Sequence, residues 1–232
     1  MYSNSSAKPF SQILYPLTLL LLFLFGGCSA QNGSHPSSLS NVLSQEQTVQ
    51  AFRKQCPPVR DPEVQQIVQS IGRRLASTRE SPRYVRIELL SCSSPFSLAV
   101  SSGLVLLSTG MLHRLPSESA LAFVLAHELA HIWLKHIEHG NNERPSEYRQ
   151  DDERDADKQA LYTIIAAHYH PWAALETFSQ PDLFQHGHSP SATHPLIQER
   201  ANTLHELLAQ ADWRPPGTVS SRSYKRMMHF LS

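Results

Sequence analysis

The chain has 232 residues, with 20 basic and 20 acidic side chains and a formal net charge of zero. At 41% hydrophobic residues, it is long and apolar enough for one globular domain with a sizeable core. The balanced charge argues against nucleic acid as a partner, because proteins that bind it usually carry a basic face.

The first 27 residues have the pattern of a bacterial export signal. Lys8 precedes an apolar run over residues 13–25, which is too short for a comfortable membrane span. Two glycines and Cys28 follow the run, and this resembles the lipobox at which signal peptidase cuts before a lipid-modified cysteine. Ser29 in place of aspartate then implies sorting to the inner leaflet of the outer membrane. Secretion with cleavage elsewhere and retention of the run as an anchor stay open.

Cys28 is therefore the expected lipid anchor, and each buried CH₂ of its acyl chains contributes about 0.8 kcal/mol to membrane binding. Residues 28–45 are rich in Ser, Asn, Gly and Pro, which predicts a flexible tether. We assign one globular domain to residues 46–213. Residues 214–232 are basic and turn-rich, and they predict a C-terminal tail.

Three segments predict the first half of the domain. Apolar residues recur at helical spacing over 64–75, with Asp61 as a cap and Pro62 in the first turn. Residues 84–90 alternate between apolar and charged side chains, which predicts a half-buried strand. Residues 96–107 predict two strands joined by a tight turn. A small sheet is therefore expected early in the domain.

Cys56 and Cys92 are the other two of the three cysteines. An exported chain meets an oxidising compartment, so a disulfide between them is one interpretation, and two buried free cysteines are the other. Neither has a visible partner that would make it a nucleophile.

Residues 127–131 read HELAH and have the HExxH spacing of a zinc-dependent hydrolase. Histidines four apart on a helix project from one face, with Cβ atoms roughly 5–6 Å apart, so His127 and His131 can bind one tetrahedral metal ion. Glu128 lies about 100° further round the helix, where a general base for hydrolysis belongs.

The helix that carries this motif is expected to be buried. Ser117 can cap it, and residues 121–137 are apolar nearly all round. His136 lies nine residues beyond His127 and hence about 180° away on a regular helix, which predicts a structural role. A random shuffle of the composition gives HExxH with a probability of about 0.04, so the motif needs support from the rest of the chain.

A zinc ion in a hydrolytic site takes three protein ligands and one water, so a third ligand is expected downstream. Residues 151–161 place Glu153 and Asp157 on the helical stripe that faces the core, whereas Asp152 and Asp155 lie off it. Glu153 is therefore the best candidate for the third ligand. Asp157, one turn on, can accept the free ring N–H of a ligating histidine. A solvated acidic helix start is the alternative.

Beyond this region the sequence predicts two further helices. One covers residues 172–178 after a proline. A stretch over residues 180–194 contains prolines, a glycine and three histidines, and Pro195 then opens the last helix.

Together these motifs resemble the HtpX and BepA-like zinc metallopeptidases, a family that includes the CAAX prenyl endopeptidases. The resemblance runs from about Pro62 to Leu208. It rests on LSTGML at 107–112, the long passage around HELAH at 118–136, ERDAD at 153–157 (similar to the family's ExxxD), HPWAA at 170–174, and THP at 193–195 with Arg200. It implies a predominantly helical α+β, zincin-like fold with a small β-sheet edging the active-site cleft. A strand at that edge is expected to pair with an extended substrate.

The resemblance also implies that His194 lies near the metal as a candidate fourth ligand or gate, whereas His186 and His188 have no match. Phe96-Ser97 stands where members usually carry Asn-Ala, and residues 101–103 replace a Pro-Gly-Gly turn, so substrate alignment is expected to differ. The transmembrane helices of the prenyl-protease and heat-shock branches are absent from the sequence. This indicates the soluble, exported branch and argues against prenylated substrates.

The sequence thus predicts a zinc-dependent metalloendopeptidase of the bacterial cell envelope that hydrolyses misfolded or unassembled proteins. One zinc ion, held by His127, His131 and Glu153, polarises the peptide carbonyl, while Glu128 takes a proton from water and passes it to the leaving amine. The alternative is a zinc-bound chaperone or assembly factor whose latent protease is gated by His194. A structural lipoprotein without metal is a third reading. The expected location is the periplasmic side of the outer membrane, with unfolded envelope proteins as substrates.

Overall fold

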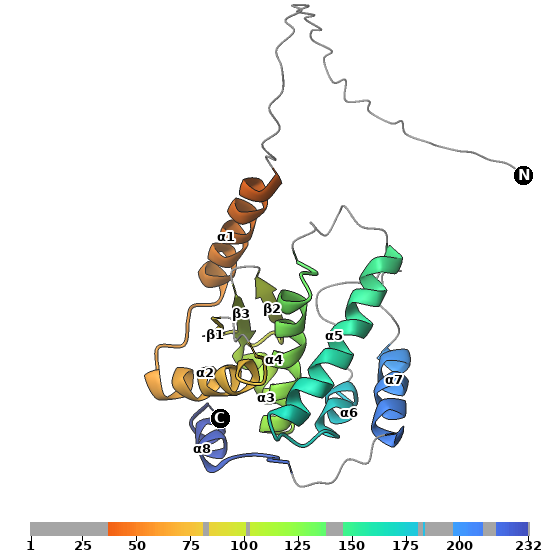
Figure 1. The fold of residues 1–232 in the computed structure, drawn as a ribbon. Helices are drawn as coiled ribbons and strands as arrows, with labels where there is room; N and C mark the ends of the chain where they lie inside the picture. Colours follow the sequence, from red (N-terminus) through yellow and green to blue (C-terminus); the bar gives the residue numbers. More distant parts are fainter. Residues whose placement is uncertain are drawn as a thin grey trace, which may run out of the picture. The chain divides into compact units, whose positions relative to one another are not determined.

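The structure, a computed structural model, describes residues 37–80, 84–100, 103–137, 146–180, 183, 197–210 and 217–231. Contacts divide the chain into two units, Met1–His35 and Pro36–Ser232, and all described residues lie in the second. The elements within these ranges (Figure 1) are α1 (Ser37–Gln55), α2 (Pro62–Ala76), β1 (Arg86–Leu90), β2 (Ser97–Val100), β3 (Leu104–Ser108), α3 (Thr109–Arg114), α4 (Glu118–Trp133), α5 (Ser146–Ala166), α6 (Ala173–Phe178), α7 (Ile197–Gln210) and α8 (Arg222–Leu231).

The three strands form a mixed sheet in the order β1-β3-β2. The central strand β3 runs parallel to β1 and antiparallel to β2, so that Leu106 pairs with Glu88 on one side and Leu98 on the other. Gly103 makes the turn between β2 and β3 with a φ of 80°, a conformation that favours glycine. The predicted strands are therefore confirmed, whereas residues 101–102 of the predicted turn lie outside the described residues.

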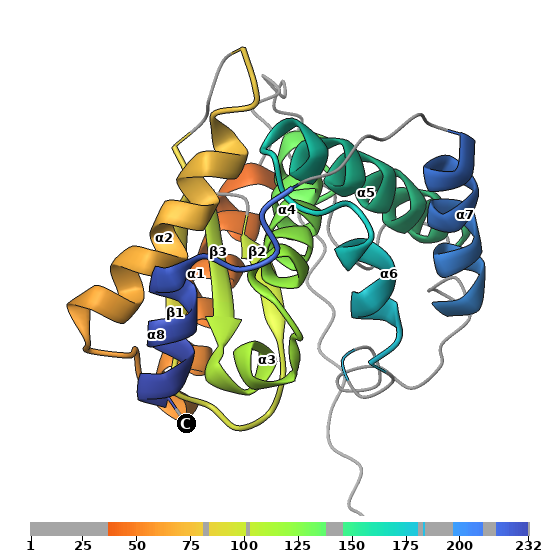
Figure 2. The same ribbon diagram turned by 90° about the horizontal axis from the view of Figure 1, so that it is seen from below.

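The alternating side chains of the sheet supply two hydrophobic faces. Ile87 and Val105 point into the main core with α2 and α4, whereas Leu90 and Leu106 join a second cluster with Phe52 of α1. Helix α1 and the α2–α4 pair thus cover opposite faces of the strands (Figure 2). Both faces are covered, so β3 is buried along its whole length and apolar from Leu104 to Leu107.

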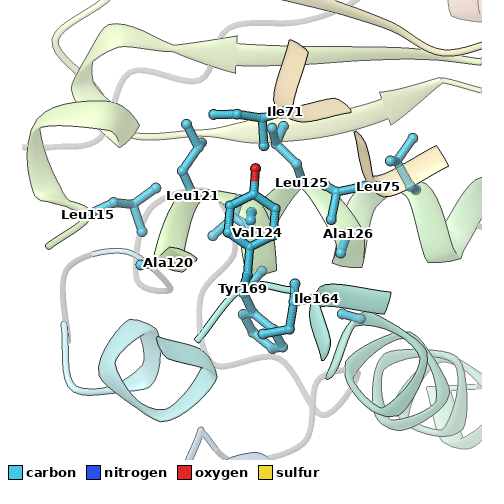
Figure 3. Close-up of a cluster of buried hydrophobic side chains, with 14 of the residues drawn as sticks. Ile71, Leu75, Leu115, Ala120, Leu121, Val124, Leu125, Ala126, Ile164 and Tyr169 are labelled. Atoms are coloured by element: carbon cyan, nitrogen blue, oxygen red, sulfur yellow. The ribbon is translucent and has the colours of Figure 1, made fainter. Parts of the chain in front are cut away.

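Helix α4 forms the centre of the main core, as its all-round apolar sequence predicts. Ser117 caps the helix by accepting a hydrogen bond from the Ala120 amide at 3.1 Å. Leu121 and Leu125 of α4 pack between Ile71 of α2 and the ring of Tyr169 (Figure 3). The chain is therefore predominantly helical with a small sheet, and the predicted α+β, zincin-like fold class is confirmed.

A disulfide joins Cys56, just after α1, to Cys92, between β1 and β2, with their Cα atoms 5.1 Å apart. This decides between the two interpretations of the cysteines in favour of the cross-link. Closing a loop across 36 residues stabilises a fold by about 4 kcal/mol in the chain-entropy account. The bond ties α1 to the segment that leads into β2.

Both ends of the domain contain helix where the sequence predicts irregular chain. Helix α1 begins at Ser37, inside the expected tether of residues 28–45. Helix α8 lies in the expected tail of residues 214–232 and buries Tyr224 and Met227. The basic residues between these apolar side chains hide their helical spacing in the sequence. The predicted domain boundaries themselves stay predictions.

Several predictions fall outside the described residues, namely the export signal with Cys28 and the loop with His186, His188 and His194. They stay predictions. Within the described ranges, none of the helices has the length and apolarity that crossing a membrane requires.

Candidate metal centre

Two helices bring three metal-ligating side chains together. The Nε2 atoms of His127 and His131 on α4 face each other at 3.1 Å. Glu153 comes from α5, and its two carboxylate oxygens lie 3.5 Å from the Nε2 of His127 and 3.4 Å from the Nε2 of His131. One ligand atom from each of these residues lies within 4.8 Å of the others, an arrangement that can hold a metal ion.

These separations fit zinc. Ligand bonds of 2.0–2.1 Å at tetrahedral angles place neighbouring donor atoms about 3.3 Å apart. The two imidazole nitrogens lie 3.1 Å apart, and each of them has one of the two Glu153 oxygens at 3.5 or 3.4 Å, close to that value. Two imidazoles and one carboxylate are also the donor set of hydrolytic zinc sites that keep a fourth position open.

His127 is supported by a buried carboxylate and arginine. Its Nδ1 lies 3.0 Å from an oxygen of Asp157, although the ring N–H is not well aligned with that oxygen. The Arg200 guanidinium donates two hydrogen bonds to Asp157, at 2.7 and 2.8 Å. It also lies 3.2 Å from the Glu153 carboxylate. Asp157 thus occupies the place that the helical stripe predicts.

Sequence reasoning did not assign a role to Arg200, which is 7% exposed and lies over the Phe178 ring at 5.0 Å. A signal was nevertheless present. Arg200, Leu204 and Leu208 follow at i, i+4 and i+8 on α7 and all three are buried. A charged residue on the apolar stripe of a helix requires a buried partner of opposite charge, and here the partners are two carboxylates.

The charged groups around His127 shift one another's pKa values. Burial opposes ionisation of Glu153 and Asp157, but contacts with the histidines and Arg200 hold the pKa of both carboxyl groups below their usual range. Burial also opposes a charged His127, but its contacts with Asp157 and Glu153 raise the pKa of that ring to about 10. This environment stabilises a cation beside the imidazole, which is the electrostatic requirement of a metal ion.

His136 does not lie on the far side of the helix, and that prediction is wrong. Helix α4 ends at Trp133, and Lys135 has a φ of 65°, so the chain turns back. The Nδ1 of His136 consequently lies 3.1 Å from the Nδ1 of His131, and its Nε2 lies 3.5 Å from Asp152. The prediction assumed a regular helix through residue 137.

Glu128, the expected general base, contacts the sheet. Its Oε1 accepts a hydrogen bond of 2.6 Å from the hydroxyl of Ser97, the first residue of β2. The side chain of Glu128 therefore connects α4, which carries it, to β2 of the sheet.

The chain matches two peptidase families. The sequence model of peptidase family M48 matches residues 58–141, which cover the sheet and the HELAH helix, and the model of peptidase U49 matches residues 118–212, which include Glu153 and Arg200. No curated protein matches the chain significantly. The first match confirms the resemblance to the HtpX and BepA-like enzymes, and residues 58–141 of the chain are similar to peptidase family M48.

Proposed function

We propose that the protein is a zinc-dependent metalloendopeptidase in which His127, His131 and Glu153 hold the ion. The observation that carries the proposal is the convergence of their three donor atoms within 4.8 Å, in a chain whose residues 58–141 match peptidase family M48. When bound, zinc supplies a Lewis acid that polarises a peptide carbonyl and lowers the pKa of water towards about 7.

Glu128 is the general base of this proposal. It accepts the proton of the attacking water and transfers it to the leaving amine, so that peptide hydrolysis needs no other acid. It follows His127 directly on α4, and this phase keeps its carboxylate beside the site but out of the ligand set.

Strand β2 is the proposed docking place of the substrate backbone. Among the described strands β2 pairs only with β3, so its other edge can hydrogen-bond an extended peptide. Such pairing is independent of most side chains and suits an enzyme that acts on unfolded protein.

The biological part of the proposal is quality control in the bacterial envelope. The apolar run that ends at Cys28 supports export and lipid attachment, with the domain on the periplasmic side of the outer membrane. The Cys56–Cys92 disulfide supports an oxidising compartment. Misfolded or unassembled envelope proteins are the proposed substrates.

The test compares the wild type with Glu128→Gln and, as a control, Glu206→Gln, which changes an exposed glutamate of α7. Elemental analysis is expected to find one zinc per chain in all three proteins. Casein cleavage should fall to a small residual rate in Glu128→Gln alone, because only this variant lacks the base. Cleavage by Glu128→Gln at the wild-type rate would disprove the assigned role.

A further inference from the structure

We propose that Ser97 is a positioning residue for Glu128: its hydroxyl holds one oxygen of the base so that the other oxygen carries the proton. The inference rests on the proposed function, since it concerns how the base of that reaction is oriented. It adds a residue of the sheet to a site otherwise built from helices.

The direction of the hydrogen bond follows from the chemistry of its partners. The Ser97 hydroxyl donates and Glu128 Oε1 accepts, since a carboxyl group that acts as a base offers lone pairs. The separation of 2.6 Å is typical of a hydroxyl bound to a charged acceptor. The bond is partly buried, so water competes with it less than at the surface.

This bond selects which oxygen of Glu128 reacts. Because Oε1 already accepts the Ser97 proton, a second proton is better accommodated on Oε2. The carboxylate is also prevented from rotating about its terminal bond. The proton taken from water therefore resides on a defined atom, from which it is delivered to the leaving amine.

Ser97 is itself held firmly. The preceding residue, Phe96, exchanges two hydrogen bonds with Ser108, at 2.9 and 3.0 Å, and its ring packs against Phe52 of α1. Ser97 also pairs with Leu107 of β3. A side chain on a backbone fixed from both sides can hold its partner in one geometry.

The placement on β2 couples the base to substrate docking. If the substrate pairs with the edge of β2 as proposed, one short strand positions both the peptide backbone and Glu128. A hydroxyl that acts on the base affects the chemical step, whereas a contact with the substrate backbone affects binding. Kinetics can separate these two roles.

The experiment uses the zinc-loaded full chain, a quenched peptide substrate and a matched pair of variants. Ser97→Thr keeps the hydroxyl. Ser97→Val introduces a side chain with nearly the same branched shape as threonine but without a hydroxyl, and both residues suit a strand. Ser97→Val should lower kcat about 10-fold or more with KM little changed, as expected for loss of a hydrogen bond to a charged group. Ser97→Thr should retain most of the wild-type kcat. Ser70→Ala, which changes an exposed serine of α2, should have no effect.

Two outcomes would overturn the inference: a wild-type kcat in Ser97→Val, or a change confined to KM. A second measurement covers the case in which the valine variant is poorly folded. The double variant Ser97→Ala/Glu128→Gln is compared with Glu128→Gln alone. If Ser97 acts through Glu128, the two proteins should have the same residual cleavage rate, whereas a further loss in the double variant contradicts the proposal. If the wild type itself fails to cleave, or Glu128→Gln cleaves normally, the proposed function fails as well, and this differs from a failure of Ser97 alone.

Discussion

The two histidines of the candidate metal centre are supported by different regions of the protein. His127 contacts Asp157, which is 3% exposed and clamped by Arg200 from α7. His131 contacts His136, which the turned-back end of α4 places beside it and which leads to Asp152, 18% exposed, at 3.5 Å. His127 is thus supported by a buried salt bridge between two helices. His131 is supported by a longer and more exposed chain of polar contacts.

This difference separates two tasks. The Arg200–Asp157 pair joins α7 to α5 and neutralises buried charge, so it should support the fold and the metal together. The His136–Asp152 contact should mainly orient the ring of His131, because neither residue has to balance a fully buried charge.

The largest effect is expected for Arg200→Met. It leaves the buried carboxylates of Asp157 and Glu153 without their cation, which should destabilise the protein by about 3–5 kcal/mol. Urea unfolding in the presence of a chelator measures this free energy without the contribution of the metal. The control is Arg226→Met, which removes an exposed arginine 3.6 Å from Glu63 and should change stability by less than about 1 kcal/mol. An equal loss of unfolding free energy in the two variants would show that the buried Arg200–Asp157 pair contributes no more than an exposed one.

A smaller effect is expected for His136→Ala. Loss of a residue that orients a ligand typically weakens metal binding about 10- to 100-fold. Zinc affinity, measured by competition with a chromophoric chelator, should fall in this range, while stability in a chelator should fall much less than in Arg200→Met. The reverse order of stabilities would contradict the comparison.

The smallest effect concerns a charged pair outside the metal centre, between Arg53 of α1 and Glu88 of β1, at 2.6 Å. Hydrogen bonds from Arg53, opposed by partial burial, hold the pKa of Glu88 below its ordinary value of 4.5. A carboxyl group with a lowered pKa stabilises the fold above its ordinary pKa, and this contribution is lost as the pH falls through the lowered value.

The free energy of unfolding of wild type and Glu88→Gln should therefore differ by about 1 kcal/mol or less at pH 7. The difference should begin to shrink as the pH falls below 4.5, the ordinary pKa of the carboxyl group, and it should disappear once Glu88 is protonated in the folded protein. If the difference in unfolding free energy between the two proteins grew on acidification, a lowered pKa of Glu88 would be contradicted.

Regular helices made much of the site predictable. The phases of His127, His131, Glu153 and Asp157 follow from 3.6 residues per turn, and the structure brings these four side chains together. The same reasoning failed at His136, because a left-handed residue at Lys135 ends the regular helix.

Long-range contacts were not predictable from spacing. Ser97 and Glu128 are 31 residues apart, and Arg200 and Asp157 are 43 apart, so only the packing of the elements brings them together. Helix α8 was missed for a local reason. Its apolar residues Tyr224 and Met227 stand among lysine and arginine, and the segment looks polar until the buried face is known.

In the proposed enzyme, α4 and α5 hold one ion jointly. Zinc content and affinity of wild type and Glu153→Ala, measured by elemental analysis after dialysis and by chelator competition, test it most directly. We expect one zinc per chain in the wild type and a large loss of affinity in the variant, because one of three protein ligands is removed. Unchanged zinc binding by Glu153→Ala would show that the carboxylate of α5 is not a ligand.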